Sequence, residues 1–178
     1  LTPRPVRVPG CYDVPQGGWL KLREDGLDTV ERLLNNPEAH LAIHHAAFDL
    51  AVFAVERPHL LPLIFAALDA GRIHCTKVRD TMLYNARVGL TDDNGPKVSF
   101  ALDAVVKRRF DIDISEDKHG PDSWRTRYSE LDDVPLEQWP DEARRYATED
   151  GVWHLRVYED QERERYSDNE HVNPADGF

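Results

Sequence analysis

A phenol and a carboxylate lie four residues apart near the end of the chain, in a stretch where apolar residues recur at helical spacing. Tyr146 and Asp150 share one stripe with Ala143, Trp153 and Val157, so all five would lie on the same helix face. Asp150 stands where an apolar residue is expected. A buried carboxylate is costly, so it usually protonates, forms an ion pair or binds a metal ion. The alternative is a single buried aspartate that is hydrogen-bonded to a neighbouring segment.

A second carboxylate interrupts another apolar segment, far from the first. Asp49 is the only polar side chain in residues 46–55, just after a short apolar segment at 41–43 that we expect to be a strand. The ligands of α/β sheets bind beyond the carboxyl ends of strands. Two independent violations of the burial pattern indicate a site more strongly than one. We therefore predict that Asp49 and Asp150 face one shared cavity.

The elements that must position these residues alternate between strands and helices. We expect strands at 6–14, 19–22, 41–43 and 73–76, and helices from 25 or 28 to 34 and at 46–56, 60–70, 80–88 and 99–110. Residues 111–140 are polar and are expected to be irregular, and Pro140 opens the long last helix. This alternation predicts an α/β layer fold.

The other polar residues and the composition have simpler interpretations. We expect Asp80 and Ser99 to be helix N-caps, and the pair Arg108-Arg109 to lie on a solvated helix face. A length of 178 residues fits one domain, and a net charge of −11 argues against tight non-specific binding to a polyanion. Two distant cysteines and the lack of a long apolar segment lead us to expect a cytoplasmic protein that makes no use of a membrane.

Several segments resemble the motifs of one enzyme family. His44-His45-Ala46-Ala47-Phe48-Asp49 resembles the second motif, His-Asn-x-x-Phe-Asp, of the DEDD 3′–5′ exonucleases, and Tyr146-x-x-x-Asp150 resembles their third motif in its tyrosine form. Between these two motifs, residues 79–83 and 99–103, followed by Lys118 and Trp124, resemble segments that the family has between its second and third motifs, and they occur in the same order. The resemblance spans about residues 6–159. It implies an RNase H-like fold, a mixed sheet flanked by helices, as in the proofreading domains of family A DNA polymerases and in RNase D.

The resemblance also implies a role for each site residue. Hydrolysis of a phosphodiester needs an activated water and neutralised charge, which two Mg²⁺ or Mn²⁺ ions about 3.5–4 Å apart provide. Asp49 and Asp150 would be metal ligands, and Tyr146 would orient the water. Phe48 would pack against the terminal nucleotide, with core packing as the alternative, and His45 and Lys118 would contact the substrate. The implied partner is the 3′ end of single-stranded DNA. A polymerase domain in the parent protein and a place in bacterial or viral replication machinery would accompany it.

Two features depart from the family pattern. His45 stands where the family has asparagine, and the first motif, Asp-x-Glu on the opening strand, is absent. We expect residues 1–166 to be one exonuclease-like domain that begins after its opening strand, and residues 167–178 to be a frayed tail. Three hypotheses stay open: a polymerase proofreading domain, an RNase D-like RNA exonuclease, and an inactive fold kept as a structural or binding module. Because half of the family's carboxylates are missing, we expect the chain alone to degrade single-stranded DNA little, if at all.

Overall fold

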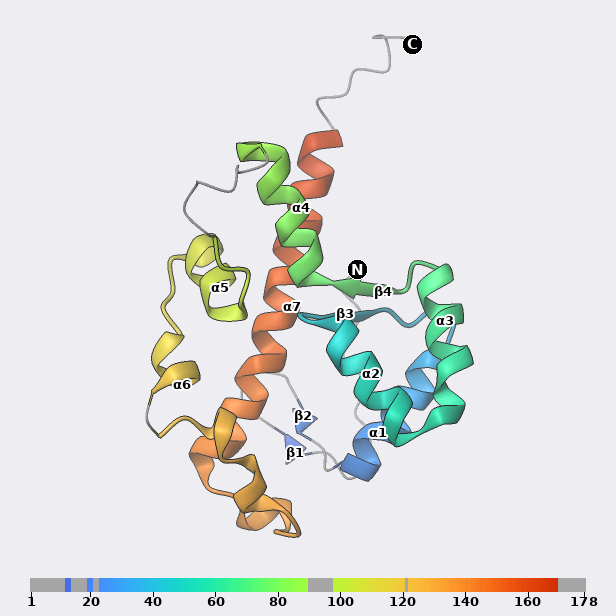
Figure 1. Cartoon of the computed structure of the whole chain (residues 1–178), viewed down its shortest axis with the longest axis vertical. Coiled ribbons are helices and arrows are strands. Elements are labelled where there is room, and N and C mark those ends of the chain that lie inside the picture. Colours follow the sequence, from blue (N-terminus) through green and yellow to red (C-terminus); the bar gives the residue numbers. More distant parts are fainter. Residues whose placement is uncertain (1–11, 14–18, 21–22, 90–97, 121, 170–178) are drawn as a thin grey trace.

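A computed structural model describes residues 12–13, 19–20, 23–89, 98–120 and 122–169, and this part of the chain is mainly helical (Figure 1). Its α-helices are α1 (Arg23–Asn35), α2 (Ala46–Glu56), α3 (Leu61–Asp69), α4 (Thr76–Val88), α5 (Leu102–Phe110), α6 (Ser115–His119) and α7 (Asp141–Asn169). Its strands are β1 (Tyr12–Asp13), β2 (Trp19–Leu20), β3 (Leu41–Ile43) and β4 (Ile73–Cys75). Short 3-10 helices occur at η1 (Pro58–Leu60), η2 (Trp124–Thr126), η3 (Tyr128–Leu131) and η4 (Leu136–Gln138).

One pair of strands determines where the loops of the site emerge. β3 and β4 pair in parallel, with Leu41 opposite Ile73 and Ile43 opposite Cys75. The segment α2–η1–α3 makes the crossover between them, because parallel strands cannot be joined by a tight turn. The residues that follow both strands therefore leave the sheet at the same edge.

The sheet is smaller than the sequence predicted. The chain does combine helices with a parallel strand pair, an α/β arrangement. Among the described residues, however, the strands form two separate pairs, β3–β4 and an antiparallel β1–β2, in place of one mixed sheet. β3 ends at Ile43, and the side chain of the next residue, His44, forms hydrogen bonds with Thr76 and with the carbonyl oxygen of Phe100. The rest of the expected strands 6–14 and 19–22 lies outside the described residues.

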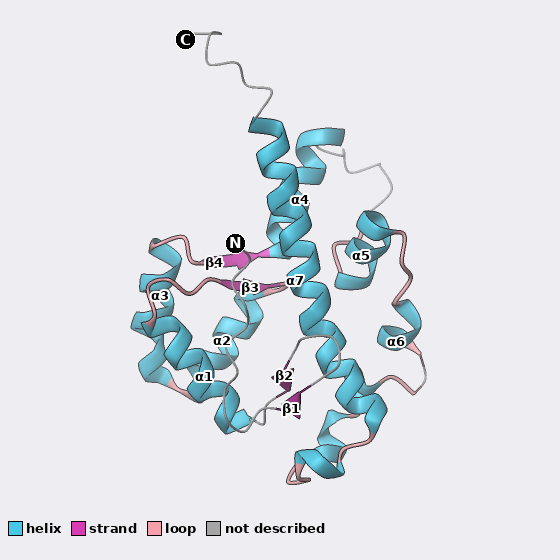
Figure 2. Ribbon diagram, turned by 180° about the vertical axis from the view of Figure 1, so that it is seen from behind, coloured by secondary structure: helices cyan, strands magenta, loops and turns pink. Residues whose placement is uncertain are grey.

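The long helix α7 passes through the middle of the molecule, with β3, β4 and α1–α3 on one side and α5 and α6 on the other (Figure 1). The view from behind agrees (Figure 2). Two apolar clusters hold this arrangement. One lies among α1, α2 and α3 and contains Leu34, Ala46, Leu50, Leu60, Ile64 and Ala67. The other joins α5 to α7 and contains Leu102, Val105, Val106, Ile114 and Val157. α7 can therefore present side chains to both halves of the molecule.

The predicted N-caps of α4 and α5 are not where these helices begin. α4 begins at Thr76, so Asp80 lies inside the helix and is not its N-cap. α5 begins at Leu102, and the Ser99 hydroxyl accepts a hydrogen bond from the Ala101 N–H at 3.3 Å without capping the helix. In α4 the Asp80 side chain pairs with Arg108 and Arg109 of another helix, a long-range contact that no local N-cap preference encodes.

The C-terminal end also differs from its prediction. α7 continues to Asn169, beyond residue 166, where the domain was expected to end, and residues 170–178 lie outside the described part. None of the described helices combines the length and the apolar character that a membrane crossing requires.

Candidate functional site

One pocket brings together five of the residues that the sequence singled out. It has a volume of about 340 Å³, and its wall includes Asp49, Tyr146, Asp150, His45 and Phe48. His45, Phe48 and Asp49 lie at the start of α2, and Tyr146 and Asp150 lie on α7. The prediction that Asp49 and Asp150 face one cavity is therefore confirmed. The sixth residue, Lys118, lies in α6, and its side chain is outside the described part of the structure.

The start of α2 projects an aromatic ring into the open side of the pocket. Phe48 is 62% exposed, so the alternative that it packs in the core is wrong. Its ring lies 6.2 Å from that of His45 with an angle of 22° between the planes. The outer face of α2 is also exposed at Val52 and Val55. An exposed ring at the mouth of a pocket offers a stacking surface for a planar ligand.

The carboxyl group of Asp49 is half-buried one turn into α2. Desolvation raises its pKa above the usual value, and the nearby His45 opposes this effect. A carboxylate that is partly removed from water gains from any cation that enters the pocket. Asp49 therefore has the electrostatic character of a ligand-binding acid more than that of a solvated surface acid.

His44, which the sequence analysis did not place in the site, organises the wall behind it. Its Nδ1 lies 3.0 Å from the Thr76 hydroxyl, and its Nε2 lies 3.0 Å from the carbonyl oxygen of Phe100. A carbonyl only accepts, so Nε2 donates and Nδ1 accepts from Thr76. Burial is the main cause that lowers the pKa of His44 to about 4. The neutral ring thus ties the end of β3 to α4 and to the segment before α5.

The α7 side of the pocket follows the predicted stripe. Ala143 and Val157 are fully buried, whereas Tyr146 and Asp150 are half-buried where the helix faces the pocket. The Tyr146 ring packs at 5.9 Å from the ring of Tyr128. His154, one turn beyond Asp150, lines the same pocket and stacks at 5.8 Å on His44. This contact aligns the α7 wall with the α2 wall.

Three further charged residues that sequence reasoning missed also line the pocket. Asp103 comes from α5 and accepts a 3.2 Å hydrogen bond from His119, while Lys77 comes from α4 and Arg125 from η2. The signal that could have found Lys77 is its position directly after the expected strand 73–76, at the sheet edge where ligands bind. Arg125 follows Trp124 in an irregular segment, where no periodicity indicates its direction.

The residues present fit a divalent metal ion in kind but not in number. Asp49 and Asp150 offer the hard oxygen donors that suit Mg²⁺ or Mn²⁺. Within the described ranges, however, no three Asp, Glu, His or Cys side chains lie close enough together to hold one metal ion. A complete set of ligands would therefore need substrate phosphate oxygens or further donors.

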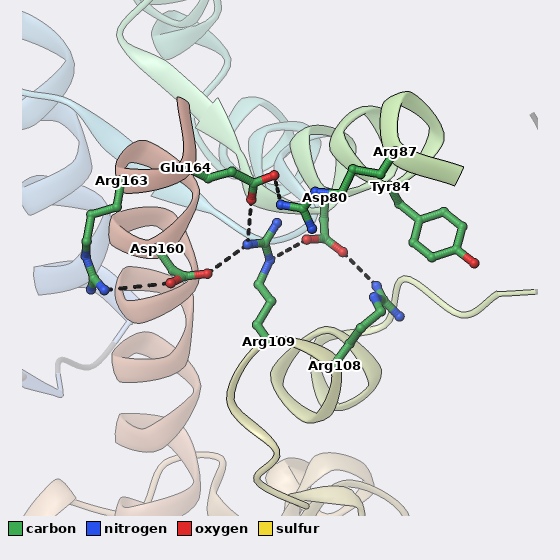
Figure 3. Close-up of a pocket in the computed structure, with 8 residues that line it drawn as sticks. All are labelled: Asp80, Tyr84, Arg87, Arg108, Arg109, Asp160, Arg163 and Glu164. Carbon is green, nitrogen blue, oxygen red and sulfur yellow. Dashed lines mark hydrogen bonds and ion pairs between the residues drawn. The ribbon is translucent and has the colours of Figure 1, made fainter. Parts of the chain in front are cut away.

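A second charged pocket, of about 490 Å³, lies between α4, α5 and α7 (Figure 3). Asp80, only 2% exposed, accepts hydrogen bonds from Arg108 at 2.6 Å and Arg109 at 2.5 Å. Arg109 also reaches Asp160 at 2.8 Å and Glu164 at 3.1 Å. The prediction of a solvated Arg108-Arg109 face is therefore wrong for Arg109, whose side chain is 8% exposed, whereas Arg108 is exposed although it pairs with Asp80. These arginines bind together three helices.

Comparison of the chain with protein-family models, with curated proteins and with solved structures found no match.

Proposed function

We propose that the pocket between α2 and α7 binds the 3′ end of single-stranded DNA, and that the chain is a 3′–5′ exonuclease-like domain such as the proofreading domain of a DNA polymerase. The observation that carries the proposal is the meeting of Asp49 and Asp150 in one pocket, although β4, α4, α5 and α6 separate them in sequence. An RNase H-like fold is part of the same proposal, and the parallel β3–β4 pair with its helical crossover supports it.

Each side chain of the pocket has a task in this proposal. The exposed ring of Phe48 stacks on the terminal base, a contact that tolerates any sequence. The Tyr146 hydroxyl would orient the attacking water, and Asp49 and Asp150 would hold divalent cations. Mg²⁺ or Mn²⁺, when bound, would activate that water and neutralise charge on the phosphodiester.

The test is release of nucleotides from a linear single-stranded DNA in millimolar Mn²⁺, with circular single-stranded DNA as the substrate that has no end. We expect slow release from the linear strand only, no release in EDTA, and near-complete loss in Asp150→Asn. Tyr146→Phe should lose roughly tenfold to a hundredfold, because it removes one water-orienting group and leaves both carboxylates. Activity that persists in EDTA or in Asp150→Asn would overturn the proposed mechanism.

The small number of carboxylates in the pocket favours a second candidate, a nucleic-acid-binding module without nuclease activity. Among the described residues, no third Asp, Glu, His or Cys side chain is close enough to complete a metal site with Asp49 and Asp150, and two carboxylates alone hold Mg²⁺ poorly because this ion gives up its water reluctantly. The same assay separates the candidates: binding of linear DNA without any release in Mn²⁺ supports the module. A chain that prefers single-stranded RNA over DNA in both measurements would support an RNase D-like exonuclease instead.

A further inference from the structure

Two cations of the candidate site differ from the other cations that the structure describes. Nearly every described arginine forms an ion pair or hydrogen bond, such as Arg57 with Asp28 at 2.5 Å and Arg127 with Glu130 at 2.9 Å. The side chains of Lys77 and Arg125 form no hydrogen bond, ion pair or ring contact with any described residue. Both line the pocket that contains Asp49 and Asp150. In an acidic protein, two cations in one pocket that pair with no carboxylate among the described residues indicate an anionic ligand.

The main chain holds both residues in place while leaving their side chains available. The Lys77 N–H donates to the carbonyl oxygen of His44 at 3.1 Å, which places Lys77 beside the end of β3. The Arg125 N–H donates to the hydroxyl of Ser123 at 3.3 Å, and Ser123 is itself buried. Lys77 is half-exposed and Arg125 is exposed. A phosphate group can therefore reach both without breaking an existing ion pair.

The second charged pocket provides the contrast. Its four arginines are matched by carboxylates: Arg108 and Arg109 by Asp80, Arg163 by Asp160, and Arg87 by Glu164 (Figure 3). Binding a phosphate there would require breaking ion pairs that are partly buried, which is costly. The pocket between α2 and α7 has no such cost at its two cations.

We propose that Lys77 and Arg125 are the phosphate-binding residues of the pocket, and that they make it select a nucleic-acid strand over a free nucleoside. This inference rests on the proposed function. It adds that the phosphates of the strand supply the affinity of the pocket for its substrate. Lys77 lies on the sheet side of the pocket and Arg125 on η2, which contacts α7. Cations on different elements suit a ligand with more than one phosphate. Phe48 accepts the base, and the two cations accept the linking phosphates.

The experiment measures binding without hydrolysis. Fluorescence anisotropy of a short 5′-labelled oligothymidylate is recorded in EDTA over a series of salt concentrations, with thymidine and the unlabelled strand as competitors. Lys77→Gln and Arg125→Gln should each weaken binding by about tenfold at low salt. Each should also lower the slope of log affinity against log salt by about 0.7, the value for one phosphate contact to a single strand. Thymidine should compete poorly.

Matched controls remove the same charge elsewhere. Lys107→Gln on α5 and Arg32→Gln on α1 are both at exposed positions and should leave affinity and slope unchanged. If Lys77→Gln and Arg125→Gln bind like the wild type while Phe48→Ala binds weakly, the inference is wrong and the proposed function stands. If the two variants lose binding as expected but the wild type releases no nucleotides in Mn²⁺, the inference stands and the nuclease activity fails. A wild type that does not bind the labelled strand at all overturns the phosphate assignment.

Discussion

At the scale of single residues, the partly desolvated carboxyl group of Asp49 lowers the stability of the fold when it is charged, a cost that a role in binding cations would explain. Burial raises the pKa of Asp49, so the protonated carboxyl group stabilises the folded protein at pH values below the pKa of Asp49 in the unfolded chain. This stabilisation is lost as pH rises through the pKa of Asp49 in the folded protein. At neutral pH the charged form therefore destabilises the fold. We expect Asp49→Asn to raise the melting temperature at pH 7 by about 2 °C, the effect of roughly 1 kcal/mol in a domain of this size.

The measurement is a pair of thermal melts at pH 7 with wild type and Asp49→Asn, beside the Mn²⁺ nuclease assay. Asp132→Asn, at an exposed site in the loop after η3, controls for the loss of one negative charge. A lower melting temperature in Asp49→Asn than in the wild type would show that the carboxylate is structural, and would remove the electrostatic argument for a ligand-binding acid.

The residues that the sequence could identify are those that violate a pattern. Asp49 and Asp150 interrupt apolar segments, and the structure places both in one pocket. Lys77 and Arg125 violate nothing, because a cation in a polar stretch normally lies in water. That neither side chain pairs with a described carboxylate becomes visible only from the positions of the described side chains in space.

At the scale of elements, the contact between α4, α5 and α7 depends on one buried acid. Asp80 on α4 receives Arg108 and Arg109 from α5, and Arg109 continues to Asp160 on α7. Asp80→Asn removes the negative charge but keeps the shape of the side chain, so the positive charge of the nearly buried Arg109 loses one of the carboxylates that neutralise it. We expect a loss of about 3 kcal/mol in the free energy of unfolding, at the lower end for a broken buried ion pair because Asp160 and Glu164 remain.

Urea unfolding at pH 7 measures this change, and Asp111→Asn is the matched control. Asp111 pairs with Lys107 at the end of α5 but is exposed, so its loss should cost far less stability than the loss of Asp80. Equal effects of the two substitutions would show that the Asp80 network does not hold the helices together.

The elements themselves were predictable to different degrees. The segments 41–43 and 46–56 were predicted with the bounds that β3 and α2 have, because short apolar runs and turn residues delimit them. The start of α4 was not, because Asp80 has the sequence signature of an N-cap while its partners Arg108 and Arg109 lie on another helix. Local preference could not reveal an ion pair between segments so far apart.

At the scale of the whole molecule, one neutral histidine joins the two halves that flank α7. His44 connects the end of β3 to Thr76 at the start of α4 and to the carbonyl of Phe100 before α5. A second link runs from α7, where the buried Gln161 donates to the Thr76 carbonyl oxygen at 2.9 Å. Protonation of His44 would place a donor against the Thr76 hydroxyl and a charge in a buried position, so acid should loosen all of these elements together.

The pH dependence follows from the lowered pKa of His44, about 4 against an ordinary value of 6.5. The neutral ring contributes full stability above pH 6.5, and that stability is lost as pH falls from there toward 4, because the unfolded chain takes up the proton first. Between pH 7.5 and pH 5.5 we expect His44 to account for a loss of about 1 kcal/mol in the free energy of unfolding. The pKa of His74 is also lowered by burial and adds to the loss in the same direction.

Urea unfolding of wild type and His44→Gln at the two pH values tests this expectation. Glutamine can still donate to the Phe100 carbonyl and accept from Thr76, but it does not titrate, so the variant should lose less stability on acidification than the wild type. His59→Gln, at an exposed position, is the control and should follow the wild type. Identical pH dependence in wild type and His44→Gln would mean that His44 is not the group whose protonation separates the elements around the pocket.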